Sequence, residues 1–86
     1  MAKYSIFFRK SVSKDLDLIP KKDVKRIMNR IEGLSDNPRP PQCEKLSAKE
    51  RYRLRQGNYR IVYSIQDEQR TLWVVKIGHR REVYRV

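Results

Sequence analysis

The sequence is poor in the residues that hold small secreted proteins and metal sites together. Of its 86 residues, one is cysteine, Cys43, and one is histidine, His79. A single cysteine excludes an intramolecular disulfide and favours a reducing compartment. One Cys and one His do not make up the ligand set of an ordinary zinc site, so we expect neither a metal nor another cofactor.

Long apolar runs are missing as well. The N-terminal stretch MAKYSIFFRK has too short an apolar segment for a signal peptide. No segment approaches the roughly 20 apolar residues of a membrane-spanning helix. We therefore expect a cytoplasmic protein with no membrane partner, and the length predicts a single domain over residues 1–86.

Acidic residues are scarce, since 10 Asp and Glu stand against 21 Lys and Arg, for a net charge of +11. Such an excess indicates nucleic acid, an anionic membrane or an acidic protein as partner. The kind of basic residue also changes along the chain. Residues 1–48 contain 7 Lys and 4 Arg, whereas residues 49–86 contain 2 Lys and 8 Arg. Because the planar guanidinium suits bidentate binding of phosphate, the C-terminal half is where we expect the chemistry.

Hydrophobic periodicity predicts the elements of the first half. Alternation over residues 3–8 predicts a strand, and Ser11 or Ser13 is expected to cap a short helix that ends at Pro20. The next segment has the clearest helical period in the chain. Its apolar face consists of Val24, Ile27, Met28, Ile31 and Leu34.

The second half is predicted to be strands. After a stiff, extended connector over residues 36–41, strands are expected at 51–55, 59–66 and 70–77, and a short one at 82–86. The strand at 70–77 is apolar on both faces, and Gly78 is expected to end it. The order β-α-α-β-β-β-β predicts an α+β fold in which a helical hairpin packs on one face of a twisted, mostly antiparallel sheet.

The segment RYRLR directs three arginines, Arg51, Arg53 and Arg55, to one side of a strand, roughly 7 Å apart. This is close to the spacing of phosphates along a nucleic-acid strand. Edge strands are also charged to prevent sheet-to-sheet pairing. Lysine or glutamate would serve that purpose equally well, and no acid interrupts this run, so phosphate binding is favoured. Arg60 opposes the segment across a tight turn and can reach the same surface.

The C-terminal segment GHRREVYR follows the most apolar strand, where a rigid element can direct functional residues. It contains an imidazole, His79, two adjacent guanidiniums, Arg80 and Arg81, and a phenol, Tyr84. A lone histidine is more often structural than catalytic. Tyr84 either joins the core or stacks on a base, as aromatic side chains do with single-stranded RNA.

The blocks YRLRQGNYRIVYSI (52–65) and LWVVKIGHRREVY (72–84) resemble the RelE branch of the RelE/ParE toxin superfamily, and the likeness covers nearly the whole chain. The resemblance implies a RelE-like fold and a type II toxin that inhibits translation. Such a toxin is a metal-independent endoribonuclease that cuts messenger RNA in the ribosomal A site. In its reaction a ribose 2′-hydroxyl attacks the adjacent phosphate and expels the 5′-oxygen. The implied partners are an acidic RelB-like antitoxin, messenger RNA and ribosomal RNA.

The resemblance also implies roles for individual residues. Arg53 and Arg55 match the two basic residues that flank the central apolar position of the strand, and Arg60 matches the arginine that stabilises the phosphorane. Arg80 matches a candidate general acid, and Tyr84 matches the base-stacking aromatic. The remaining basic residues are expected to contact RNA of the ribosome: Lys49, Arg51, Arg81 and Arg85.

The chain departs from the RelE pattern at Arg53 and Arg55, where members of the family often have lysine. Arginine does not readily give up a proton near neutral pH, so Arg55 is a poor general base. Two explanations stay open. Catalysis rests on preorganised positive charge around the phosphate, or His79, with an ordinary pKa of about 6.5, carries a proton.

Two other functions share much of this pattern. A ParE-like toxin poisons a topoisomerase through protein contacts and needs no nuclease site. A non-catalytic RNA-binding homologue would keep the arginines without cleavage. The compact arginine set and the GHRREVY ending favour the RelE reading over the ParE one.

Overall fold

The computed structural model describes residues 3–46 and 51–79, which form a five-stranded sheet and two helices. The chain order is β1 (Ser5–Phe8), α1 (Lys10–Asp17), α2 (Lys21–Gly33), β2 (Glu44–Lys45), β3 (Arg51–Gln56), β4 (Tyr59–Gln66) and β5 (Thr71–His79). The strands lie in the order β1-β5-β4-β3-β2. β1 pairs with β5 in parallel and the other pairs are antiparallel. The predicted α+β class and order of elements are confirmed.

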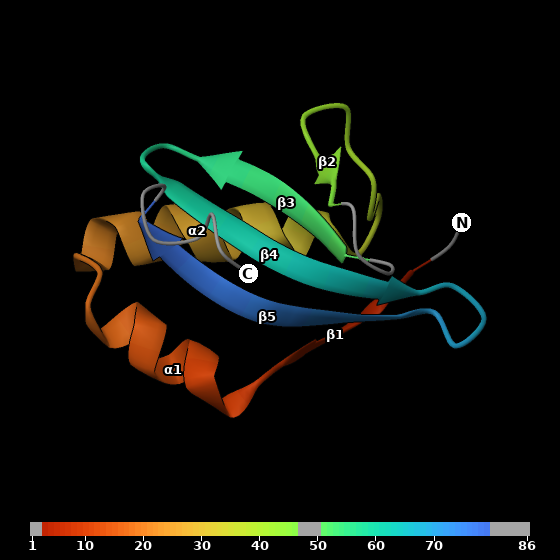
Figure 1. Cartoon of the computed structure of the whole chain (residues 1–86), viewed down its shortest axis with the longest axis horizontal. Helices are drawn as coiled ribbons and strands as arrows, with labels where there is room; N and C mark the ends of the chain where they lie inside the picture. The colour runs from red at the N-terminus through yellow and green to blue at the C-terminus, as the bar shows by residue number, and fades with distance from the viewer. Residues whose placement is uncertain (1–2, 47–50, 80–86) are drawn as a thin grey trace.

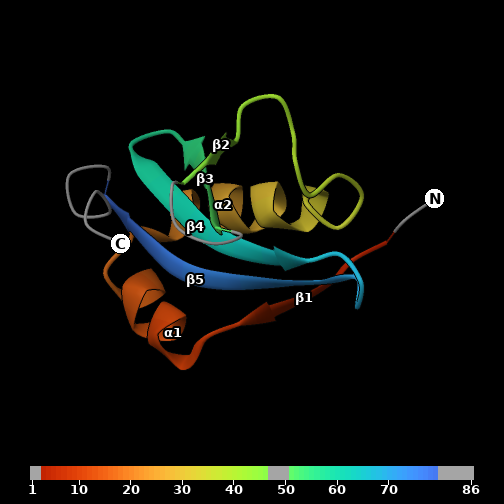
Figure 2. The same ribbon diagram turned by 45° about the vertical axis from the view of Figure 1, so that its right-hand side comes forward.

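The helix α2 lies across one face of the sheet, behind β3 and β4 in Figure 1, while α1 lies beside β5 (Figures 1 and 2). Three residues of the predicted apolar face of α2, Ile27, Ile31 and Leu34, are at most 1% exposed. They pack against alternate residues of the strands, as the period of two in a strand requires. The sheet side of this core consists of Tyr52, Leu54, Ile61, Tyr63, Ile65, Leu72, Val74 and Ile77. We call this side of the sheet the covered face and the other side the open face.

Several element boundaries differ from the predicted ones. Neither Ser11 nor Ser13 caps α1, because the backbone N–H of Arg9 still donates to Val74 of β5 and the helix begins directly afterwards, with Arg9 at its N-cap. The proline-rich connector is bent by turns rather than extended, and it leads into β2, which the sequence did not predict. The predicted strand at 82–86 lies outside the described residues.

The strand β5 does not end at Gly78 but continues to His79, paired with the start of β4. It also contains a bulge. Val62 pairs with Lys76, yet its neighbour Tyr63 pairs with Val74, so one residue of β5, Val75, is extra. A bulge of this kind shifts the alternation of side chains by one from that point onward. This explains why the buried apolar side chains of β5 are at 72, 74 and 77 rather than at every second residue.

The helix α1 is anchored to the part of β5 that extends beyond β1. The carboxylate of Asp15 accepts a hydrogen bond from the backbone N–H of Ile77 (3.1 Å) and another from Nζ of Lys76 (3.0 Å). The Asp15 side chain is 11% exposed, so this pair is better shielded from solvent than a surface ion pair. Asp15 thereby satisfies a backbone donor on the edge of β5 that no strand covers.

A polar cluster at the other end of the sheet fastens the connector. Arg39 donates to both carboxylate oxygens of Asp67 (3.1 and 2.8 Å) and to the hydroxyl of Tyr52 (3.0 Å). Tyr4 donates its hydroxyl to Asp67 (2.6 Å). These hydrogen bonds, with that of Arg39 first, lower the pKa of Asp67 to about 2. Beneath them, Tyr63 donates to the carbonyl of Pro38 (2.8 Å), and burial raises the pKa of its phenol above the usual range.

No helix within residues 3–46 and 51–79 is long and apolar enough to cross a membrane.

Candidate nucleic-acid interface

Arginines gather on the open face of β3 and β4. The strand β3 buries Tyr52 (6% exposed) and Leu54 (0%), so the residues between them project to the other side. These are the predicted outward arginines, Arg51, Arg53 and Arg55. β3 pairs with β4 along its whole length, but on its other side β2 pairs only with Tyr52 and Arg53. Among the described residues no strand covers the edge of β3 at Arg55, so charge at this position also acts against sheet-to-sheet pairing.

Arg60 joins this row through the register of the hairpin. Gly57 adopts a φ of +60°, which glycine tolerates without strain, and the tight turn places Arg60 directly opposite Arg55. Directly paired residues point to the same face with Cβ atoms about 5 Å apart. On its other side Arg60 pairs with Gly78, which has no side chain. Arg55 and Arg60 therefore share one small part of the open face.

The cross-strand pair of arginines is unfavourable on its own. Like charges opposite each other destabilise a sheet, and Arg60 is only 6% exposed, so water screens its charge poorly. An anion placed between the two guanidiniums would remove the repulsion and accept charge-assisted hydrogen bonds from both. A phosphate with charge on several oxygens matches this arrangement, and its transition state, with more charge developing on these oxygens, matches it better.

An acidic residue that the sequence did not indicate belongs to the same surface. Glu44 of β2 pairs in register with Arg53, and its carboxylate accepts a hydrogen bond from Nη2 of Arg53 (3.3 Å). Glu44 is 68% exposed, so the pair contributes little to stability. Its effect is to offset part of the charge of Arg53. No sequence pattern links residues 44 and 53, because β2 has two residues and no alternation to read.

His79 does not share a face of the sheet with Arg55 and Arg60. It pairs with Tyr59, whereas Arg60 pairs with Gly78, and neighbours along a strand point to opposite faces. The imidazole packs against the edge of the Tyr59 ring, with centroids 5.9 Å apart, in a depression of about 320 Å³ that Asp15 and Ile19 of the α1 region also line. The bulge in β5 turns His79 to the covered face, whereas Arg55 and Arg60 lie on the open face.

Five of the predicted site residues lie outside the described residues, and they remain predictions: Lys49, Arg80, Arg81, Tyr84 and Arg85. The residues described do bring together Arg53, Arg55 and Arg60 as the sequence predicted, with Arg51 at the far end of the row. Within residues 3–46 and 51–79 no three His, Cys, Asp or Glu side chains are close enough to hold a metal ion.

Aromatic side chains also reach the open face, farther along the strands. Phe7 of β1 and Trp73 of β5 are 44% and 39% exposed and stack with ring centroids 5.1 Å apart. The sequence predicted residues 70–77 to be buried on both faces, and for Trp73 this is wrong. The reason is that α2 packs on the opposite face of the sheet and α1 lies beside β5 (Figure 2).

Comparison with known proteins shows that the chain is similar to toxins of type II toxin–antitoxin systems. The family model of the ParE toxins of type II toxin–antitoxin systems matches residues 6–84. A RelE toxin of Methanocaldococcus jannaschii is 33% identical over 89 residues, covering 96% of this chain and 97% of its own.

Solved structures with the same fold include an archaeal RelE–RelB complex from Pyrococcus horikoshii, with a TM-score of 0.83 and 27% identity over 96% of this chain and 100% of that one. The RelBE2 toxin–antitoxin complex of Mycobacterium tuberculosis has a TM-score of 0.79 and 25% identity, over 91% of this chain and 99% of that one. The likeness therefore spans both helices and the sheet that carries the arginines.

Proposed function

This chain belongs to the ParE toxin family of type II toxin–antitoxin systems, within the RelE branch of the RelE/ParE superfamily, and we propose that it is an endoribonuclease that cleaves messenger RNA on the ribosome. The observation that carries this proposal is the cross-strand pair of Arg55 and Arg60, which concentrates two guanidiniums on the open face.

In the proposed reaction, the 2′-oxygen of a ribose forms a bond to the adjacent phosphorus while the bond from phosphorus to the 5′-oxygen breaks. The products are a 2′,3′-cyclic phosphate and a free 5′-hydroxyl, and one proton moves from the 2′-oxygen to the 5′-oxygen overall. Arg55 and Arg60 stabilise the charge that develops on the non-bridging oxygens of the phosphorane. Arg53 binds the neighbouring phosphate, and the carboxylate of Glu44 offsets part of its charge.

We assign the role of general base neither to the arginines of the open face nor to His79. Guanidinium stays protonated at neutral pH, and His79 lies on the covered face beside Tyr59. Of the two explanations left open by the sequence, the location of His79 supports catalysis by preorganised positive charge. Arg80 remains the candidate general acid because of the resemblance to RelE toxins alone.

The test is to express the wild-type chain and an Arg60→Ala variant in cells and to map the ends of messenger RNA. We expect the wild type to produce cuts in phase with codons and Arg60→Ala to reduce them about 100-fold or more. Arg26→Ala is the matched control, because it removes the same charge from the exposed side of α2. Adding Arg80→Ala to Arg60→Ala examines the C-terminal arginine in the same assay.

Growth arrest by the wild type without codon-phased cuts would contradict the proposal. DNA-damage signalling in that case would favour the alternative, a topoisomerase-poisoning toxin. RNA binding with neither arrest nor cuts would identify a homologue without catalysis.

We also propose an acidic antitoxin of the RelB type as partner. The solved relatives from Pyrococcus horikoshii and Mycobacterium tuberculosis are complexes of a toxin with its antitoxin. The net charge of +11 on this chain favours a partner of opposite charge. Co-expression with the product of an adjacent reading frame, followed by purification on a tag carried by the toxin alone, should recover both chains and relieve growth arrest.

A further inference from the structure

The stacked pair of Phe7 and Trp73 forms an exposed aromatic surface on the open face. The two residues pair in register, and their rings lie at 28° to one another. The register pairing continues across the sheet. Trp73 pairs with Ser64 of β4, and Ser64 pairs with Arg51 of β3. All four side chains therefore belong to the same face as the arginine pair.

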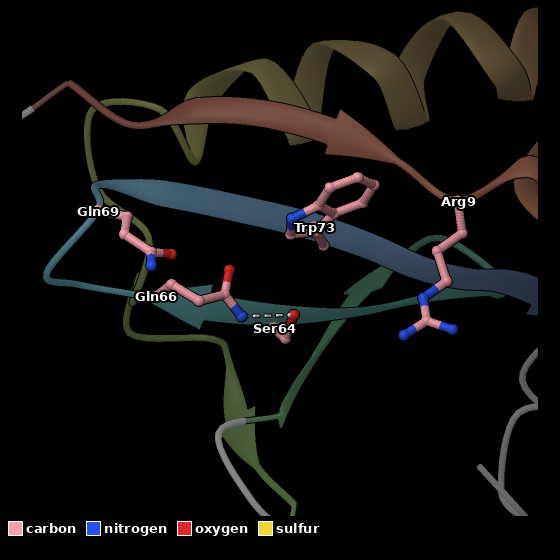
Figure 3. Close-up of a pocket in the computed structure, with 5 residues that line it drawn as sticks. All are labelled: Arg9, Ser64, Gln66, Gln69 and Trp73. Carbon is pink, nitrogen blue, oxygen red and sulfur yellow. Dashed lines mark hydrogen bonds between the residues drawn. The ribbon is translucent and has the colours of Figure 1, made fainter.

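Polar side chains surround this aromatic surface. Trp73 lines an open depression of about 410 Å³ together with Arg9, Ser64, Gln66 and Gln69 (Figure 3). Gln66 donates to the hydroxyl of Ser64 (3.2 Å), and its carbonyl accepts from Thr71 (3.2 Å), so its amide is held in one orientation. None of the described residues that line the depression is acidic.

The chemistry of this lining matches a nucleobase better than a peptide or a lipid. An aromatic ring provides a stacking surface that every base can use. The amides of Gln66 and Gln69 and the hydroxyl of Ser64 offer both donors and acceptors to the edge of a base. Arg9, at the end of β1, extends over the sheet beside Trp73, as Figure 3 shows, and supplies a positive charge for a phosphate.

The depression lies on the same strand as the arginine pair. Arg60 and Ser64 are four residues apart on β4, which separates them by roughly 13 Å. A single-stranded RNA covers such a distance with about two nucleotides. Arg53 and Arg51 pair with Val62 and Ser64 and lie beside this path, and Val62 itself is 0% exposed, so RNA would pass over the side chains that cover it.

From these observations we infer that the depression is a binding site for one nucleobase of the RNA substrate, stacked on Trp73 about two nucleotides from the cleaved phosphate. This inference rests on the proposed function for the identity of the ligand. It assigns base stacking to a described residue of β5, in addition to Tyr84, for which the family resemblance implies base stacking. It predicts that cleavage depends on a base outside the bond that is cut.

The first experiment uses the wild-type chain, whose one tryptophan is Trp73. A short single-stranded RNA with 2′-O-methyl groups, which block the attacking hydroxyl, is titrated against the tryptophan fluorescence. Stacking should quench the signal in a saturable way. A series of the same RNA with one base removed at each position in turn should show one position, about two nucleotides from the one held by Arg55 and Arg60, where affinity falls roughly 5- to 100-fold.

The second experiment compares neighbouring phenylalanines. Phe7 and Phe8 are similarly exposed, at 44% and 38%, but Phe8 lines an apolar groove with Ile6 and Met28 on the covered side. We expect Phe7→Ala and Trp73→Ala to weaken RNA binding and Phe8→Ala to leave it unchanged. Trp73→Phe should restore most of the binding, which separates loss of the ring from loss of folding.

The inference is overturned if no abasic position weakens binding, or if Trp73→Ala binds the RNA as well as the wild type does. Loss of binding to the antitoxin but not to the RNA in Trp73→Ala would make the surface a protein-docking site and would also overturn it. Failure of the proposed function looks different. In that case the wild type produces no codon-phased cuts, whatever the fluorescence shows.

Discussion

The two faces of the sheet are made from alternate residues of the same strands. They differ in composition, and α2 packs on only one of them. The covered face of β4 presents Ile61, Tyr63 and Ile65, which are at most 2% exposed beneath α2. The open face of the same strand presents Arg60 and Ser64 beside the arginine row and Trp73. Neighbours in the sequence can thus serve stability on one face and ligand binding on the other, because consecutive side chains of a strand point in opposite directions.

The largest expected effect is a difference in the free energy of unfolding between variants of Ile61 and of its neighbour Arg60. Ile61 is 0% exposed, and Ile61→Ala should lower the free energy of unfolding by about 2–5 kcal/mol through lost burial and the cavity left behind. Arg60→Ala should change it by less than about 1 kcal/mol, since it also removes the repulsion with Arg55. Urea denaturation of both variants measures the contrast. Equal losses of stability would show that the two faces are not divided in this way.

A second prediction concerns the polar cluster that fastens the connector. The pKa of Asp67 is lowered to about 2 from 3.8. A carboxylate with a lowered folded-state pKa stabilises the fold above its unfolded pKa, and this contribution disappears as the pH falls toward the folded value. Asp67→Asn should therefore reduce Tm at pH 7 and differ little from the wild type at pH 2. Thermal melts across this range measure it, and a constant difference at all pH values would contradict it.

A third prediction uses the position of His79 on the covered face. His79→Ala should keep cleavage within about twofold of the wild type and leave its pH dependence between pH 5 and 8 unchanged. Cleavage on isolated ribosomes across this range is the measurement. A pH profile that loses one ionisation in His79→Ala would return the imidazole to the proton-transfer role.

The smallest expected effect concerns Glu44, the acid beside Arg53. Glu44→Gln should strengthen binding of single-stranded RNA by a factor of up to about five at low salt, because an exposed ion pair is worth at most about 1 kcal/mol. The gain should shrink as salt screens the charges. Lys45→Gln, a change on the same short strand, is a control for the effect of losing a charge of the opposite sign. Weaker binding by Glu44→Gln would mean that Glu44 mainly positions Arg53.

Much of the fold was readable from the sequence, because strong periodicity leaves few ways to bury apolar side chains. The faces of α2 and β3 follow directly from the spacing of Ile27, Ile31, Tyr52 and Leu54. The pairing of Arg55 with Arg60 follows from a two-residue turn at Gly57. Local patterns of this kind need no knowledge of distant parts of the chain.

Other features depend on pairings between distant segments. β2 brings Glu44 to Arg53 only through the path of the connector, which Arg39 and Asp67 hold in place. The exposure of Trp73 depends on which face of the sheet the helices cover. Residues 70–77 form a strand that is apolar on both faces, and no pattern in the sequence predicts that one of these faces is exposed to solvent.

By itself, the sequence determined the excess of positive charge, the concentration of arginine in the second half, and the alternation that separates arginines from core residues. The tertiary structure decided which of these side chains meet. The bulge at Val75 is the clearest case, because a regular β5 would have placed His79 on the open face with Arg60. One extra residue reverses the alternation, turns His79 away and leaves Gly78 beside Arg60. Pairing with β4 fixes that register, and no local pattern in residues 70–79 reveals it.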